Sequence, residues 1–80
     1  MVNLTSTEVQ QTIATFLDGE PDQWDWDDFI SIPITDPYLD AIRVICGELP
    51  RIFPPDSHSR DYCNKDGVNV LRAIVREFLQ

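Results

Sequence analysis

The chain has 80 residues, of which 42% are hydrophobic and 25% charged, and its formal net charge is −8. This composition predicts one globular domain, residues 1–80, with a core too small to hold an enclosed active site easily. We therefore expect neither an enzyme nor a cofactor. Direct binding to nucleic acid or to an anionic membrane is also not expected, since both depend on clustered Lys and Arg.

The charge is unevenly distributed along the chain. Residues 1–42 hold nine acidic residues and no Lys or Arg, whereas residues 43–80 hold five acidic and six basic residues. Such an acidic half favours a basic protein as partner. The N-terminus lacks the basic and apolar regions of a secretory signal, and no stretch approaches the ~20 apolar residues of a membrane helix. These features predict a cytoplasmic protein.

The first predicted helix covers residues 6–18. Thr5 and Glu8 fit a capping box, in which each side chain accepts a hydrogen bond from the other residue's backbone N–H. Gly19 follows as the expected helix stop. The apolar residues with a helical period, which should face the core, are Val9, Ile13, Phe16 and Leu17.

The next segment, 22–28, contains two Trp and four Asp. Asp22 is predicted to cap a short helix, with Asp25 in its first turn, where negative charge is favourable. Pro33 should end this helix. Its buried face is predicted to consist of Trp26, Phe29 and Ile30. The alternative is a strand over residues 24–30, which the density of Asp disfavours.

The third helix opens with Asp36 as N-cap and Pro37 as its first residue. Pro50 is expected to close it, because proline removes a backbone donor. The turn over residues 50–55 should then fold Ile52 and Phe53 back onto the core. The predicted buried face of the helix consists of Leu39, Ile42, Ile45, Cys46 and Leu49, and Arg43 lies off this face.

The last helix is capped by Asn64 or Asp66. Its predicted buried stripe consists of Val68, Leu71, Ile74, Val75 and Phe78, with Val70 and Leu79 beside it. Arg72, Arg76 and Glu77 are expected to face solvent. Together these elements predict an all-α fold, a compact bundle of three longer amphipathic helices plus one short helix.

No residue pattern is typical of a catalytic or metal site. Asp56, Ser57 and His58 have the residue types of a catalytic triad, but adjacency in sequence is not triad geometry. The aspartates have no calcium-loop spacing, and Cys46, Cys63 and His58 lack a fourth zinc ligand. Cys46 is interpreted as a core residue and Cys63 as half-buried, while the sequence leaves open whether they form a disulfide. No metal is expected.

The acidic segment instead suggests a partner-binding face. Trp24 would be its aromatic anchor, since Trp is frequent among binding hot spots, and the carboxylates would speed association with a basic protein. The predicted partner-binding residues are Asp18, Glu20, Trp24, Asp25, Asp27 and Asp28. Two alternatives remain. One is a small metal- or thiol-dependent enzyme using the Asp cluster or Cys63. The other is a homodimeric structural subunit that buries Trp24 and the 50–55 turn.

The segment W-D-W-D-D-F resembles one in small uncharacterised bacterial proteins. The resemblance covers roughly residues 13–78 and implies no function. The pattern continues in this chain as Asp36-Pro37, Ala41-Ile42-Arg43, Leu49-Pro50, Phe53-Pro54-Pro55, Tyr62-Cys63, and Gly67 with Leu71-Arg72. In size, helical plan, acidic balance and final amphipathic helix, the chain is also similar to acidic immunity proteins of the colicin D type. That likeness implies an inhibitor that covers a nuclease with carboxylates, and nucleic-acid mimicry is a related expectation. No contact residue is carried over from it.

Overall fold

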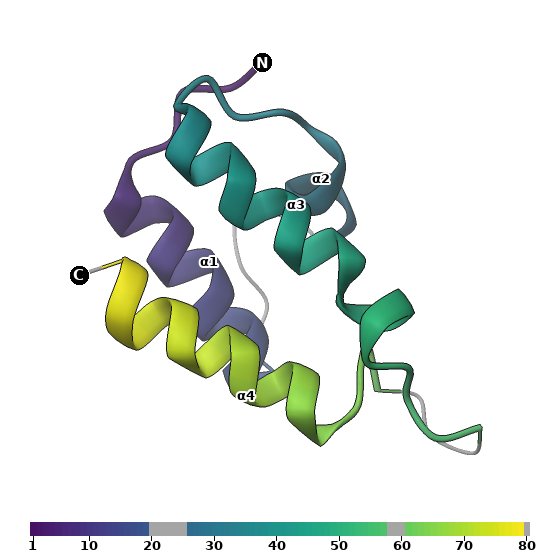
Figure 1. Ribbon diagram of the computed structural model, residues 1–80. Helices are drawn as coiled ribbons and strands as arrows, with labels where there is room; N and C mark the ends of the chain where they lie inside the picture. The colour runs from purple at the N-terminus through teal and green to yellow at the C-terminus, as the bar shows by residue number, and fades with distance from the viewer. Residues whose placement is uncertain (20–25, 58–60, 80) are drawn as a thin grey trace.

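Four α-helices make up most of the described residues, 1–19, 26–57 and 61–79, in the computed structural model (Figure 1). They are α1 (Ser6–Asp18), α2 (Trp26–Ser31), α3 (Pro37–Ile52) and α4 (Lys65–Ala73), which continues into a π-helical turn, η1 (Ile74–Phe78). The predicted bundle of three longer helices and one short helix is confirmed. The alternative prediction, a strand over residues 24–30, is wrong for residues 26–30, which are helical. None of the described helices has the length and apolar character to cross a membrane.

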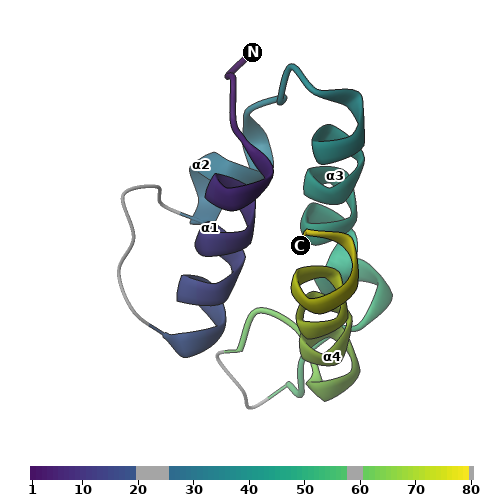
Figure 2. The ribbon, with the colours of Figure 1, turned by 90° about the vertical axis from the view of Figure 1, so that its left-hand side faces the viewer.

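The helices enclose one hydrophobic core. Figure 2 shows α1 and α2 on one side of the bundle and α3 and α4 on the other. The N-terminal segment joins the α2–α3 linker through a parallel bridge between Val2 and Ile34. The buried core residues are Val9, Ile13, Phe29, Ile34, Leu39, Ile42, Cys46, Leu49, Cys63, Leu71, Ile74 and Leu79.

Helix α1 has the ends that its sequence predicts. The Glu8 N–H donates to the Thr5 hydroxyl at 3.1 Å, and the Thr5 N–H donates to the Glu8 carboxylate at 3.0 Å. Gly19 adopts a left-handed conformation with φ of 73°, which glycine reaches without the steric cost of a side chain. The capping box and the glycine stop are therefore both confirmed.

The side chain of Arg43 on α3 joins this helix to the last turn of α2. Arg43 Nε donates to Asp40 Oδ1 at 2.7 Å, and its guanidinium also donates to the Ile30 carbonyl at 2.7 Å. The Ile34 N–H donates to the same Asp40 oxygen at 2.9 Å. The Arg43 hydrogen bond, with help from the Ile34 N–H, lowers the pKa of Asp40 below its usual value. Arg43 lies off the apolar face, as predicted, yet its side chain is largely buried.

Pro50 does not end α3, which continues to Ile52. The expectation that Pro50 closes the helix is wrong, and the structure supplies a physical reason. A proline inside a helix leaves the carbonyl four residues earlier without its N–H donor, and here that carbonyl belongs to Cys46. The Tyr62 hydroxyl donates to the Cys46 carbonyl at 2.8 Å. A side chain distant in sequence thus replaces the missing backbone donor.

Two apolar residues expected in the core are instead exposed on α3. Ile45 and Ile52 are 45% and 52% exposed, so their predicted burial is wrong. The residues that are buried form a narrow stripe at helical spacing, at positions 39, 42, 46 and 49, and both isoleucines fall to the same side of it. Phe53 does pack partly buried against the core, as predicted.

The last helix is capped by Asn64, whose side chain accepts from the Gly67 N–H at 3.1 Å. At its other end Phe78 is 55% exposed and Leu79 is 1% exposed, the reverse of the prediction. The π-helical turn η1 explains this error. A turn with i→i+5 bonding holds one extra residue, so the face toward the core passes from Phe78 to Leu79.

Candidate protein-interaction site

Four aromatic rings join α1, α2 and the segment before α4. The Phe16 and Trp26 rings are stacked with their centroids 3.9 Å apart, and Tyr62 meets both of them edge-on at 5.5 and 5.7 Å. Phe29 lies 5.3 Å from Trp26. The predicted placement of Trp26 and Phe29 on the core side of α2 is confirmed. Because Phe16 is in the last turn of α1 and Trp26 begins α2, the stack holds these two turns together.

The same two turns carry three exposed carboxylates, which we call the acidic surface: Asp18, Asp27 and Asp28. Asp18 ends α1, and Asp27 and Asp28 follow Trp26 directly in α2. The other predicted partner-binding residues, Glu20, Trp24 and Asp25, lie outside the described residues, as does the proposed cap Asp22. The structure therefore describes three of the six predicted residues, in two helix turns that the Phe16–Trp26 stack joins.

The acidic surface differs from the carboxylates that the fold uses. Glu8 and Asp36 cap helices, and Asp40 binds both Arg43 and a backbone N–H. Within the described residues, the side chains of the acidic surface have no hydrogen bond or ion pair. Their charge is therefore left facing solvent.

Asp18 is also placed where the helix itself disfavours negative charge. It is the last residue of α1, and that helix has no basic residue in its last turn. The carboxylate therefore adds to the negative end of the helix dipole. Asp27 and Asp28 occupy the first turn of α2, where the dipole favours them.

We expect Asp18→Asn to raise the free energy of unfolding by about 0.3–1 kcal/mol, because it removes this repulsion. Urea denaturation monitored by circular dichroism would measure the change. The matched control is Glu8→Gln at the other end of α1, which weakens the capping box and should lower stability by about 0.5–1 kcal/mol. A destabilised Asp18→Asn variant would show that Asp18 supports the fold.

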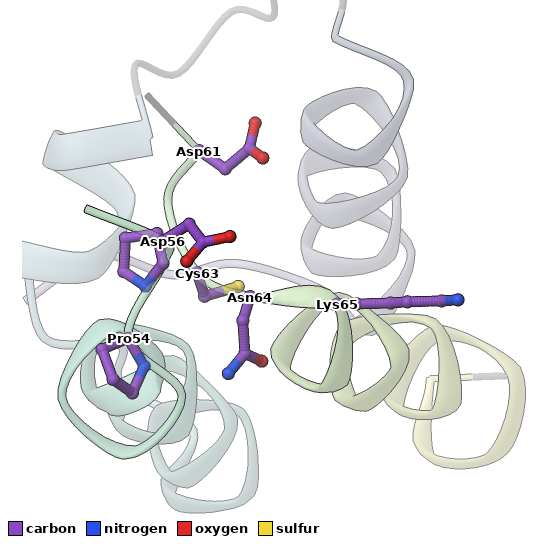
Figure 3. Close-up of a pocket in the computed structure, with 7 residues that line it drawn as sticks. Pro54, Asp56, Asp61, Cys63, Asn64 and Lys65 are labelled. Carbon is purple, nitrogen blue, oxygen red and sulfur yellow. The ribbon is translucent and has the colours of Figure 1, made fainter. Parts of the chain in front are cut away.

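A second surface feature is an open groove of about 550 Å³ beside the start of α4 (Figure 3). In Figure 3 the Lys65 side chain extends away from Asp56 and Asp61, so cationic and anionic groups do not converge on one point. No group of three or more His, Cys, Asp and Glu side chains suits a metal ion in the described part of the chain. The groove is lined by Pro54, Pro55, Asp56, Asp61, Cys63, Asn64 and Lys65.

Neither cysteine has the surroundings of a reactive thiol. Both are free and buried, with Cys63 only 2% exposed, so the expectation that Cys63 is half-buried is wrong. Burial raises the pKa of Cys46 to about 12 and also raises the pKa of Cys63, on which the Asp61 charge acts in the same direction. A raised pKa disfavours the thiolate, which is the nucleophilic form. This environment does not favour thiol chemistry at Cys63.

Sequence reasoning missed the part that Tyr62 plays in positioning these elements. Its ring completes the aromatic cluster, and its hydroxyl bonds α3 at Cys46. The only signal in the sequence was Pro50 inside an otherwise helical pattern, which implies an unsatisfied carbonyl but does not identify its donor.

The chain was compared with protein-family models, with curated proteins and with solved structures. No family model, curated protein or solved structure matches it.

Proposed function

We propose that the protein is a non-enzymatic interaction module whose acidic surface binds a basic protein. An immunity-type inhibitor of a nuclease, or a mimic of nucleic acid, is a concrete form of this function. The observation that carries the proposal is that Asp18, Asp27 and Asp28 are exposed and that their side chains make no hydrogen bond or ion pair to the described residues.

Two further observations support this function. Asp18 opposes the dipole of its own helix, so its charge is not explained by the stability of α1. The Phe16–Trp26 stack joins the last turn of α1 to the first turn of α2, so the carboxylates project from two turns that are held by a ring contact. A preorganised patch of one sign attracts an oppositely charged partner and speeds the encounter.

Affinity capture from the host's own lysate, with the protein immobilised, tests the proposal. We expect a basic protein to be retained at low salt and released as salt rises, because exposed charge pairs are screened over about 10 Å at 0.1 M salt. A triple variant with Asp18, Asp27 and Asp28 changed to Asn should lose this retention.

The control is a second triple variant with the same change in net charge at other places, Asp56→Asn, Asp66→Asn and Glu77→Gln. All three residues are exposed and lie outside the acidic surface. It should retain the partner as the unmodified protein does. An equal loss of partner retention in both triple variants would show that net charge, and not the acidic surface, determines binding. Retention of the partner by the first triple variant would refute the proposed surface.

A further inference from the structure

Helix α3 presents an apolar stripe to solvent. Four of the six large hydrophobic side chains that are exposed in the described residues lie on this one helix. They are Tyr38, Val44, Ile45 and Ile52, exposed by 52%, 45%, 45% and 52%, and we call them the outer stripe. The buried face of α3 points to the core, away from this stripe. At one end of the stripe the Tyr38 hydroxyl donates to the Phe78 carbonyl at 2.9 Å, and about half of each of the four side chains remains open to solvent.

The spacing of the outer stripe is symmetric. Tyr38, Ile45 and Ile52 are separated by seven residues on each side, which is two helical turns, the repeat by which helices pair along a seam. Two α3 helices placed antiparallel about a two-fold axis at Ile45 bring Tyr38 of each copy opposite Ile52 of the other. A face of this kind complements itself, as a two-fold interface requires.

The charges on α3 also suit a second copy. The chain has a formal net charge of −8. Helix α3 is nevertheless neutral, because it holds two acidic residues, Asp40 and Glu48, and two basic residues, Arg43 and Arg51. Two copies can therefore bring this helix together without the repulsion that the acidic half would cause.

The size of the stripe indicates how tight the pairing should be. Four half-exposed side chains offer at most roughly 400 Å² of apolar surface, since half of a large aromatic side chain is only ~100 Å² and three of the four are smaller. A standard interface buries about 800 Å² on each partner. The outer stripe supplies at most about half of this, and neighbouring polar side chains must supply the rest, which is typical of a reversible dimer.

We propose that the outer stripe of α3 is the interface of an antiparallel, two-fold homodimer. The acidic surface belongs to α1 and α2, so dimerisation leaves it free, and the homodimer does not depend on the proposed function. The interface differs from the one that the sequence suggested, because it uses the exposed side of α3 and shares only Ile52 with the 50–55 turn.

Sedimentation velocity from about 1 µM to about 500 µM would measure the equilibrium, with half-dimerisation expected at tens to hundreds of micromolar. Ile45→Glu should shift the midpoint at least tenfold, since it puts two carboxylates at the axis. The control is Asn69→Glu, which adds the same charge at an exposed position of α4 and should leave the midpoint unchanged. Wild type that stays monomeric throughout, or an unchanged midpoint in Ile45→Glu, would overturn the proposal.

Cysteine cross-linking tests the antiparallel geometry separately. Both native thiols are buried, so introduced thiols will react first. Ile45→Cys alone should form a disulfide dimer on mild oxidation, because the axis brings each copy of this residue next to the other. Tyr38→Cys and Ile52→Cys should cross-link when mixed but much less when each is alone. Cross-linking of each separately, as in a parallel pair, would contradict the arrangement.

Discussion

Gly67→Ala is expected to lower the free energy of unfolding by about 1–3 kcal/mol, because the added methyl group overpacks the core. A Cβ on this residue would lie 2.7 Å from Cys63 Sγ and 2.9 Å from Cys63 Cβ, and 3.2 Å from Phe53 Cβ. Gly67 and Cys63 are both buried, and a Cβ attached to the main chain cannot swing aside. The contact explains why glycine is needed in the first turn of α4.

Chemical denaturation of Gly67→Ala beside Gly47→Ala would measure this effect. Gly47 is exposed on α3, and a Cβ there would meet Ile30 atoms no closer than 3.8 Å, which is ordinary contact. Gly47→Ala should therefore stabilise the protein by about 0.5–1 kcal/mol through helix propensity. The two substitutions are chemically identical and should have opposite signs. A stabilised Gly67→Ala variant would contradict the packing of α4 against Cys63.

Tyr62→Phe is expected to lower the free energy of unfolding by about 1–3 kcal/mol, the cost of leaving a buried acceptor without its donor. The substitution keeps the ring in the aromatic cluster and removes only the hydroxyl that bonds the Cys46 carbonyl. No backbone N–H can take its place, because the residue four positions later is Pro50.

The same substitution in a Pro50→Ala background separates this hydrogen bond from other effects of the hydroxyl. The Pro50→Ala change restores a backbone N–H for the Cys46 carbonyl, so Tyr62→Phe should cost no more than about 0.5 kcal/mol there. The double-mutant cycle should give a coupling energy of about 1–2 kcal/mol. A cost that is equal in both backgrounds would mean that the hydroxyl does not replace the missing donor.

Helix starts and the general plan of the bundle were predictable because their causes are local. Thr5 with Glu8, Asp36 with Pro37, and Asn64 each cap a helix through residues within a few positions. Apolar spacing likewise predicted the side of α2 that carries Trp26 and Phe29. Such signals lie within a single stretch of sequence, so no knowledge of the other helices was required.

The errors come from interactions between distant parts of the chain. Pro50 fails to end α3 because Tyr62, twelve residues later, satisfies the carbonyl. Ile45 fits the helical spacing of the apolar residues in α3 but is exposed. The width of the buried stripe depends on the elements that pack against α3, and the spacing alone does not give it. The exchange of Phe78 for Leu79 follows from the π-helical turn η1, for which the residue pattern carried no sign.

The residues of the acidic surface could be predicted from the sequence, but their placement on the helices could not. The sequence predicted that six residues of the 18–28 segment form one partner-binding face. The described residues add that Asp18, Asp27 and Asp28 belong to two helix ends held together by the Phe16–Trp26 stack. Within the described residues, no hydrogen bond or ion pair involves these side chains, in contrast to Glu8, whose carboxylate closes the capping box. This distinction cannot be read from the number of carboxylates.

The most direct test of the central claim is the affinity of the captured basic partner for wild type and for the triple variant of Asp18, Asp27 and Asp28, measured by calorimetry at about 50 mM and about 200 mM salt. If the acidic surface is the binding site, the wild-type Kd should rise about tenfold or more with salt, and the variant should bind at least tenfold more weakly at low salt. Thermal melting should show that the variant is still folded, since the gain from removing the Asp18 charge opposes the loss of two carboxylates that the α2 dipole favours. Equal affinities for the two proteins, or a complex insensitive to salt, would contradict the account.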